Sequence, residues 1–337
     1  MVNKIYESIK NFMKYNWSFL LTIVLFLVIF LVKLPYQVEM PGGIIDLNNR
    51  VTVNGEEVKT DGTFNMAYVR VVQGNIPYVL LSFIIPDWDL VKDEDYIYEN
   101  ETIEDSNKRQ KLYLEQSKNY ATVAALETAN IPYEIRNKVN HVVYISKDSK
   151  SNFKVGDYIL EVEGKELFDL NEMTDIIAAT DVGKKLHFVV LRNDKEVEVE
   201  AEVYEDKDKH YVGVSVITTF EIDCDLDVEI YSKSSESGPS GGMMMALMTY
   251  NAITNQDLTK GKKIVGTGTI ALDGSVGEIG GVKYKLMGAV RNHADVFLVP
   301  DGENYEEALK VKENKKYDIE IVAVKTLQDA ISYLEGL

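Results

Sequence analysis

A serine in a glycine-rich segment stands directly before an apolar run in the C-terminal third of the chain. Residues 234–242 read Ser-Ser-Glu-Ser-Gly-Pro-Ser-Gly-Gly and continue into Met243–Met248. Because proline suits the first turn of a helix, we expect Ser240 at the opening of a helix whose unpaired N–H groups point toward it. Ser240 is therefore a candidate nucleophile, and the backbone at Ser240 and Gly241 is a candidate oxyanion site.

Other chemistries fit this segment less well. A glycine-rich helix start also binds phosphate, but the Gly-x-x-x-x-Gly-Lys-Ser/Thr spacing occurs nowhere in the sequence, so no ATP-driven step is expected. The methionines are interpreted as core filling rather than as metal ligands, because soft filler is their usual role. We expect the chain to need no cofactor and no metal.

A nucleophilic serine needs a base, and the four histidines are poor candidates. His141 and His187 lie on predicted strands, His210 in a charged turn and His293 at a helix end. None stands in an obvious relation to Ser240. A lysine is the better candidate.

Lys285 lies within a predicted amphipathic helix. Its apolar positions 282, 286, 289 and 290 have the i, i+4, i+7, i+8 spacing of a core-facing stripe, and Lys285 occupies the i+3 position. A lysine among core residues loses hydration, which lowers its pKa from ~10.4 toward values where it can accept a proton. The alternative is a lysine stem that lies along apolar surface with its head in water, but the nearby serine segment favours a base. Lys283 lies two residues earlier, at a different angle around the helix, and is not part of this apolar stripe.

Three ordered segments carry a resemblance to a known family. They are Gly238-Pro239-Ser240, then Val265–Ile270 with Gly274 and Gly277, and then Ile279–Lys285 followed by Val296–Pro300. Together they resemble the proteolytic domain of the Lon proteases. The resemblance implies a Ser–Lys dyad of Ser240 and Lys285, with Thr267 orienting the lysine.

Two residues depart from the Lon pattern. Ser237 stands where many Lon proteases have an acidic residue, and Gly241 stands where they have alanine. These differences concern the rigidity of the loop rather than the dyad. Residues 114–121 also resemble a helix internal to the Lon-type domain, so the segment between the two matches is expected to be an insertion.

Residues 131–205 form that predicted insertion. The pattern Phe153 to Gly164, followed by a helix capped by Asp169 and a hairpin containing Arg192, resembles the bacterial PDZ domain. In that family a peptide adds as a strand beside an early strand and a helix. The resemblance places the groove at His141, Val142, Val143, Tyr144, Ile145, Met173, Ile176 and Ile177. A structural spacer that binds nothing is the alternative.

An acidic segment follows the predicted PDZ-like unit. Residues 221–230 alternate between acidic and apolar side chains, which indicates one half-buried strand with a solvated face. Calcium binding is the alternative, but a flat strand cannot wrap six to eight oxygens around an ion.

The N-terminal half contains further predicted elements. Short β-rich runs between residues 42 and 72 are separated by Asn54-Gly55 and Asp61-Gly62, which indicates an antiparallel segment. The apolar run Ile76–Ile85 ends at Pro86 and is interpreted as a buried strand. Residues 103–129 contain no glycine or proline and are predicted to form a long helix.

Residues 17–32 are almost wholly apolar and uncharged, and with their flanks they predict one transmembrane helix over 16–35. A cleaved signal peptide is the alternative, but no small-residue cleavage pattern follows. Three lysines precede the helix (Lys4, Lys10 and Lys14), whereas only Lys33 and Arg50 lie close behind it. The positive-inside rule therefore predicts a cytoplasmic tail at 1–15 and an extracytoplasmic body.

Composition limits the classes of function. The chain has 337 residues and a formal charge of -18, which disfavours a nucleic-acid partner because the phosphate backbone repels that charge. Cys224 is the only cysteine, which excludes an intramolecular disulfide framework and a Cys-rich zinc site.

The predicted fold is α+β, with one N-terminal transmembrane helix and a Lon-type proteolytic domain, residues 36–130 and 206–337, that contains the PDZ-like insertion. The whole chain resembles the membrane-anchored, PDZ-containing Lon-like proteases of Gram-positive bacteria. The resemblance implies an ATP-independent serine endopeptidase at the cell membrane that acts on extracytoplasmic peptides or proteins. A membrane-tethered PDZ adaptor with an inactive protease domain is the alternative. The sequence leaves open whether the chain forms a homo-oligomer.

Overall fold

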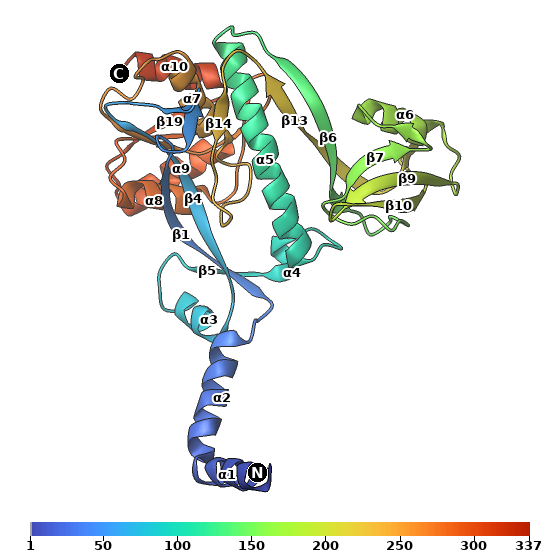
Figure 1. Cartoon of the computed structure of the whole chain (residues 1–337). Coiled ribbons are helices and arrows are strands. Elements are labelled where there is room, and N and C mark those ends of the chain that lie inside the picture. Colours follow the sequence, from blue (N-terminus) through green and yellow to red (C-terminus); the bar gives the residue numbers. More distant parts are fainter. Residues whose placement is uncertain (1) are drawn as a thin grey trace. The chain divides into compact units, whose positions relative to one another are not determined.

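The computed structural model describes residues 2–337, and the chain divides into two compact units. The first unit consists of the chain up to Met40 together with Arg70–Tyr96, and the second consists of Pro41–Val69 and Ile97–Leu337. Figure 1 follows the chain through its helices and strands. Strands β1 (Tyr36–Asp46) and β4 (Thr63–Gln73) each contribute residues to both units.

The first unit begins with two helices, α1 (Val2–Tyr15) and α2 (Trp17–Leu31). Helix α2 ends four residues before the predicted limit of the membrane helix, and the chain continues without regular structure before β1. Within the described residues, no single helix has both the length and the apolar character to cross a membrane. Among the described residues, only the helix pair Lys4–Tyr15 and Trp17–Leu31, taken together, is long and apolar enough, and the two helices are bent by 76° relative to each other.

The predicted buried strand over Ile76–Ile85 is wrong, because this segment begins with helix α3 (Ile76–Ser82) and several of its apolar side chains are exposed. The helix has a local cause: the Asn75 side chain accepts a hydrogen bond from the Tyr78 N–H, and Pro77 occupies the first turn. Strand β5 (Asp89–Lys92), which pairs antiparallel with the start of β1, and helix α4 (Asp93–Tyr96) complete the first unit.

The second unit is built on a sheet with the order β19-β18-β15-β4-β1. Its C-terminal strands are β15 (Lys263–Gly266), β18 (Val296–Pro300) and β19 (Glu320–Val324), and β15 pairs in parallel with both β4 and β18. Alternate residues of β15 enter different cores: Ile264 joins one and Val265 the other. Helices α5 (Ile103–Thr128), α7 (Gly242–Ile253) and α10 (Leu327–Glu335) contribute to the first core, and α8 (Val282–Arg291) and α9 (Glu303–Lys315) contribute to the second.

A separate core belongs to the PDZ-like part of the second unit. Its sheet has the order β10-β9-β7-β6-β13, with α6 (Leu170–Ala179) packed against it. The strands are β6 (Glu134–Ile145), β7 (Tyr158–Val162), β8 (Lys165–Glu166), β9 (Lys185–Arg192), β10 (Lys195–Glu202), the β11–β12 hairpin (Tyr204–Asp206, Lys209–Tyr211) and β13 (Val214–Asp223). All its buried residues fall between 142 and 212, whereas the core that holds α7 combines residues 47–124 and 243–334. The PDZ-like part thus interrupts the other domain in sequence, and β13 extends its sheet beyond residue 205.

The acidic segment 221–230 does not form one strand. Strand β13 ends at Asp223, a bend follows, and β14 (Val228–Ile230) begins a new strand. The reason is that β13 pairs with β6, while β14 pairs with β2 (Val51–Val53) in a different sheet. The predicted alternation of exposure is nevertheless present, because all five carboxylates are exposed.

Short hairpins complete the second unit. Strand β2 turns into β3 (Glu56–Glu57) through Asn54 and Gly55, whose φ angles of 54° and 76° confirm the predicted turn. Strands β16 (Thr269–Ile270) and β17 (Val276–Gly277) pair antiparallel between β15 and α8.

Candidate active site

Ser240 lies in the turn that precedes helix α7. The helix begins at Gly242, and Gly241 is its N-cap, so Ser240 lies just before the helix. The turn is held by two backbone hydrogen bonds of 3.0 Å: the Gly242 N–H donates to Pro239 O, and the Met243 N–H donates to Gly268 O. Ser240 itself is half-buried. The nucleophile candidate is therefore fixed beside the positive end of α7.

The backbone N–H groups of Ser240 and Gly241 stay available for an oxyanion. No hydrogen bond formed by the described residues uses either group. The next two N–H groups, at Gly242 and Met243, are already bonded. The predicted oxyanion role of Ser240 and Gly241 stays a prediction, and the backbone around them is compatible with it.

Thr267 is fully buried and bonds to the serine residue. Its Oγ1 donates a hydrogen bond of 3.0 Å to the backbone carbonyl of Ser240, which also accepts the Gly268 N–H at 2.8 Å. The Thr267 N–H donates to Leu298 O at 3.0 Å, so the residue connects the end of β15 and the middle of β18 to the Ser240 turn. The hydroxyl lone pairs remain for an amine, and the predicted orientation of Lys285 by Thr267 stays a prediction.

Lys285 lies in the predicted helix, which the structure gives as α8. Its neighbours along the stripe, Val282, Leu286 and Ala289, are all fully buried, and Lys285 is only 3% exposed. Burial lowers the pKa of Lys285 to about 8, as the sequence argument expects. The helix starts from Gly281, which has a φ of 70° that favours glycine.

Neither a charge nor a hydrogen bond from another described residue contributes to the lowered pKa of Lys285. Burial alone therefore accounts for its lowered pKa. Catalytic hydrogen bonds are often long without substrate and shorten in the substrate complex, so this geometry leaves a base role open.

Two residues that sequence reasoning missed hold the loop before Ser240. The Arg50 guanidinium contacts Glu236 at 3.0 Å, with both side chains mostly buried. The other Glu236 oxygen accepts the Lys233 N–H at 2.8 Å, and the Tyr231 N–H donates to Arg50 O at 2.7 Å. Arg50 and Glu236 are 186 residues apart, so no local pattern could reveal the pair.

Helix α5 contacts the same loop from another side. The Gly238 N–H donates to Gln110 O at 2.8 Å, and Ser117 Oγ donates to Pro239 O at 3.2 Å. The approach is so close that a Cβ at Gly242 would collide with Ser117 Oγ. The small side chains of Ser117 and Gly242 therefore let helix α5 approach the turn that carries Ser240.

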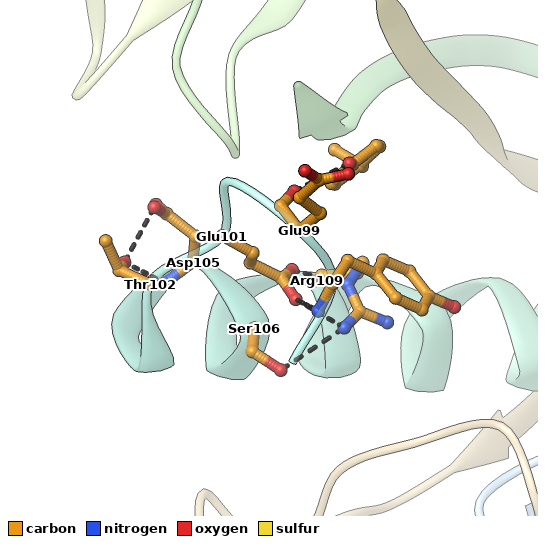
Figure 2. Close-up of polar contacts among 8 residues, drawn as sticks. Glu99, Glu101, Thr102, Asp105, Ser106 and Arg109 are labelled. Carbon is orange, nitrogen blue, oxygen red and sulfur yellow. Dashed lines mark hydrogen bonds and ion pairs between the residues drawn. The ribbon is translucent and has the colours of Figure 1, made fainter. Parts of the chain in front are cut away.

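The start of α5 is itself anchored by a buried ion pair, which Figure 2 shows. The Arg109 guanidinium donates two hydrogen bonds, of 2.6 and 2.8 Å, to Glu101, and both side chains are nearly fully buried. Glu99, in the same loop, contacts Lys147 at 2.9 Å, and its carbonyl accepts the Tyr144 hydroxyl at 2.7 Å. The loop before α5 is thus bonded both to α5 and to the end of the PDZ-like strand β6.

The predicted PDZ groove stays a prediction, and strand pairing limits where a peptide could add beside it. Strand β6 pairs with β13 along His141–Ile145, and it pairs with β7 only at Asn140 and His141. Met173 and Ile177 are buried in the PDZ-like core rather than exposed in a groove, and only Ile176 of the predicted helix residues is half-buried. The free edge next to His141–Ile145 belongs to β13.

Part of that β13 edge is already occupied by α5. Gln116 Nε2 donates to Thr218 O at 3.2 Å, and Asn119 Oδ1 accepts the Phe220 N–H at 3.0 Å. Val142 and Val143 are fully buried, and burial lowers the pKa of His141. The section of β13 before Thr218 is the remaining candidate for strand addition.

Comparison with known proteins assigns both halves of the second unit. A profile of the Lon protease (S16) C-terminal proteolytic domain matches residues 223–334. This segment is thus similar to a Lon-type proteolytic domain. A PDZ profile matches residues 115–203, which begins inside α5 and ends before β13. The expected combination of these two domains in a mixed α+β fold is confirmed.

Relatives of the Lon-type domain are full Lon proteases. The chain is 33% identical over 98 residues to the Lon protease of Rhizobium meliloti, which is 29% of this chain and 12% of that protein. It is 32% identical over 110 residues to the peroxisomal Lon protease homolog 2 of Caenorhabditis elegans, covering 32% of this chain and 14% of that protein. The chain thus spans only a small part of these relatives.

A solved structure matches the PDZ part. The PDZ domain of an SdrC-like protein from Listeria monocytogenes has 19% identity and a TM-score of 0.23, and the match covers 25% of this chain and 93% of that domain.

The described residues contain no group of three or more His, Cys, Asp or Glu side chains that could hold a metal ion.

Proposed function

We propose that the chain is an ATP-independent serine endopeptidase with Ser240 as nucleophile and Lys285 as general base. The Lon-type domain supports a serine peptidase, and one observation carries the finer assignment. Lys285 is buried at the start of α8, and its pKa is lowered to about 8, which is unusual for a lysine without a catalytic role.

In the proposed reaction, neutral Lys285 accepts the proton of Ser240 Oγ as this oxygen attacks the scissile carbonyl carbon. The N–H groups of Ser240 and Gly241 stabilise the oxyanion of the tetrahedral intermediate. Protonated Lys285 then gives its proton to the leaving amine, and an acyl-enzyme remains on Ser240. Water, deprotonated by Lys285, hydrolyses that ester and releases the second product.

Thr267, Arg50 and Glu236 support this chemistry as positioning residues. Thr267 holds the carbonyl of Ser240, and the Arg50–Glu236 pair holds the loop before it. A rigid loop keeps the nucleophile near its reactive geometry, where misplacement by ~1 Å can cost about 100-fold in rate.

The proposal also includes the membrane. The apolar helix α2 anchors the chain, and the domains act on extracytoplasmic peptides or proteins. This part is supported by the uncharged sequence of α2 and the lysines that precede it. The PDZ domain recruits substrate by strand addition at the free part of β13, where Val216 packs against the same core as the half-buried Ile176 of α6.

The direct test is cleavage of unstructured peptides by the purified full chain in detergent micelles. We expect cleavage without ATP and in the presence of a chelator, and no cleavage by Ser240→Ala of equal thermal stability. Equal activity of the wild type and Ser240→Ala would contradict the assignment. No cleavage by the wild type of any peptide, together with peptide binding to the PDZ domain, would favour a tethered adaptor instead.

A further inference from the structure

A short apolar segment of the first unit is exposed, although its sequence is typical of a core. Leu80 and Leu81, at the end of α3, are 58% and 38% exposed, and Phe83 and Ile84, in the following turn, are both 75% exposed. With i, i+1, i+3 and i+4 spacing, they lie on one side of this helical turn. A contiguous exposed apolar patch marks an interaction surface in folded proteins. We name Leu80, Leu81, Phe83 and Ile84 the apolar tip.

The position of the apolar tip is fixed relative to the end of α2. The Asn75 side chain accepts the Tyr78 N–H at the start of α3 and donates to Phe30 O at the end of α2, both at 3.0 Å. The Leu34 N–H donates to Gly74 O at 2.8 Å. One residue therefore caps one helix while bonding to the other, and the chain before it is bonded to the exit of α2.

A second set of bonds stiffens the same junction. Gln73 Nε2 donates to Leu34 O and Tyr36 O at 2.7 and 3.0 Å, and Gln37 Nε2 donates to Gln73 Oε1 at 2.8 Å. These contacts lie within the first unit, where α2 and α3 pack together. Helix α3, which leads into the apolar tip, is thus bonded through Asn75 to the end of α2.

Helix α2 is shorter than a membrane is thick, which gives a physical reason for an exposed apolar tip at its end. At ~1.5 Å per residue, the 15 residues of α2 span about 22 Å, whereas a hydrocarbon core is about 30 Å thick. Apolar side chains fixed at one end of a short membrane helix lengthen the apolar surface and reduce this mismatch. Tyr78 and Trp88, with ring centroids 6.1 Å apart, lie near the tip and are the residue types enriched at membrane–water interfaces.

We propose that the apolar tip inserts into the outer leaflet of the membrane beside α2, as a second contact of the chain with lipid. The inference rests on the proposed membrane anchoring by α2. The binding is apolar rather than electrostatic, because residues 74–86 carry no charge. It should therefore be insensitive to salt and to anionic lipid, unlike a basic interfacial segment.

The test uses the full chain with Cys224→Ser, which leaves no cysteine. Single cysteines are then placed at Phe83 or Leu80 in the tip, at Leu25 in α2, and at exposed Glu94 in the same unit as a control. Each is labelled with a fluorophore that reports polarity. The proteins are reconstituted in phosphatidylcholine vesicles with and without phosphatidylglycerol, and each variant must first keep the wild-type melting temperature.

Quenchers carried on the lipid chains and aqueous iodide then separate the outcomes. We expect lipid-borne quenching at Phe83, Leu80 and Leu25, none at Glu94, and equal results with both lipid compositions. Quenching at Leu25 with iodide access at Phe83 and Leu80 would overturn the inference while the anchor stands. A tip label that neither quencher reaches would show that protein covers it, and would also overturn the inference. Loss of lipid quenching at Leu25 would instead overturn the anchoring itself.

Discussion

Thr267 Oγ1 donates a hydrogen bond of 3.0 Å to the backbone carbonyl of Ser240, not to its side chain. The bond connects the end of β15 to the turn that carries the candidate nucleophile. Because this carbonyl also accepts the Gly268 N–H, two donors from one strand end fix the same peptide plane. The plane between Ser240 and Gly241 includes the Gly241 N–H, so its orientation also aims one candidate oxyanion donor.

Replacement of Thr267 should therefore lower kcat more than it changes KM. Thr267→Val keeps the shape but removes the hydroxyl, and we expect kcat to fall about 10-fold, the equivalent of one lost hydrogen bond in a buried site. Thr267→Ser restores the hydroxyl and should recover most of the rate. Steady-state kinetics on a short peptide measures both. A Thr267→Ser variant as slow as Thr267→Val would show that the methyl group, not the bond, matters.

Burial of Lys285 should cost stability at neutral pH. Its pKa is about 8 in the folded protein and ~10.4 in an unfolded chain, so between these values the unfolded state binds more protons and stability rises with pH. Below pH about 8 both states are protonated and the full penalty is present. We expect Lys285→Met to raise the free energy of unfolding by about 3 kcal/mol at pH 6.

Urea denaturation at several pH values measures this difference, and the gap between Lys285→Met and the wild type should narrow from pH about 8 upward. The matched control is Lys283→Met on the same helix, which removes a half-buried lysine instead of a fully buried one. A Lys285→Met variant that is less stable than the wild type at every pH would mean that its ammonium group is well solvated.

The Arg50–Glu236 pair should matter for both stability and rate. Arg50→Gln leaves Glu236 mostly buried without its cation, which costs about 1–3 kcal/mol, and loosens the loop before Ser240. We expect a lower melting temperature and a fall in kcat. The control is Lys108→Gln, which breaks an exposed pair with Glu104 on α5 and should change neither. Unchanged kcat in Arg50→Gln would remove this pair from the positioning residues.

Substrate recruitment can be tested on α6. Ile176→Arg introduces a charge on α6, which packs against the same core as β13, and should raise KM for long substrates while short peptides are cut at the wild-type rate. Ala178→Arg makes a similar change on the exposed face of the same helix and serves as the control. If both variants cut long and short substrates like the wild type, the PDZ domain is a spacer.

Local patterns were sufficient for the parts of the site that depend on sequence spacing. The i, i+4, i+7 stripe around Lys285 and the glycine-rich run before α7 both predict elements that the structure contains, because helix periodicity and helix starts are set by near neighbours. The failure at Ile76–Ile85 is of a different kind. Hydrophobicity suggested a core strand, although Asn75 and Pro77 already carry the signal of a helix start.

Local sequence patterns could not predict contacts between segments that are distant in sequence. The bond between Arg50 and Glu236 and the pairing of β13 with β6 join segments that are distant in sequence. The place of β13 at the edge of the PDZ-like sheet could not be predicted for the same reason, since the edge of a sheet depends on the last strand to join it. The prediction of one strand over the acidic segment 221–230 was wrong for the same reason, because its two halves pair in different sheets.

The central claim is that Ser240 is the nucleophile with Lys285 as its base, and the pH dependence of Ser240 phosphonylation by a fluorophosphonate tests it most directly. A fluorophosphonate forms a stable adduct with an activated serine, and mass spectrometry of digested protein gives the site and the rate. We predict a single adduct on Ser240, with a rate that rises with pH around a midpoint near 8, is lost in Lys285→Met and is kept in Lys283→Met. An adduct elsewhere, or equal rates on Ser240 in the wild type and Lys285→Met, would contradict the claim.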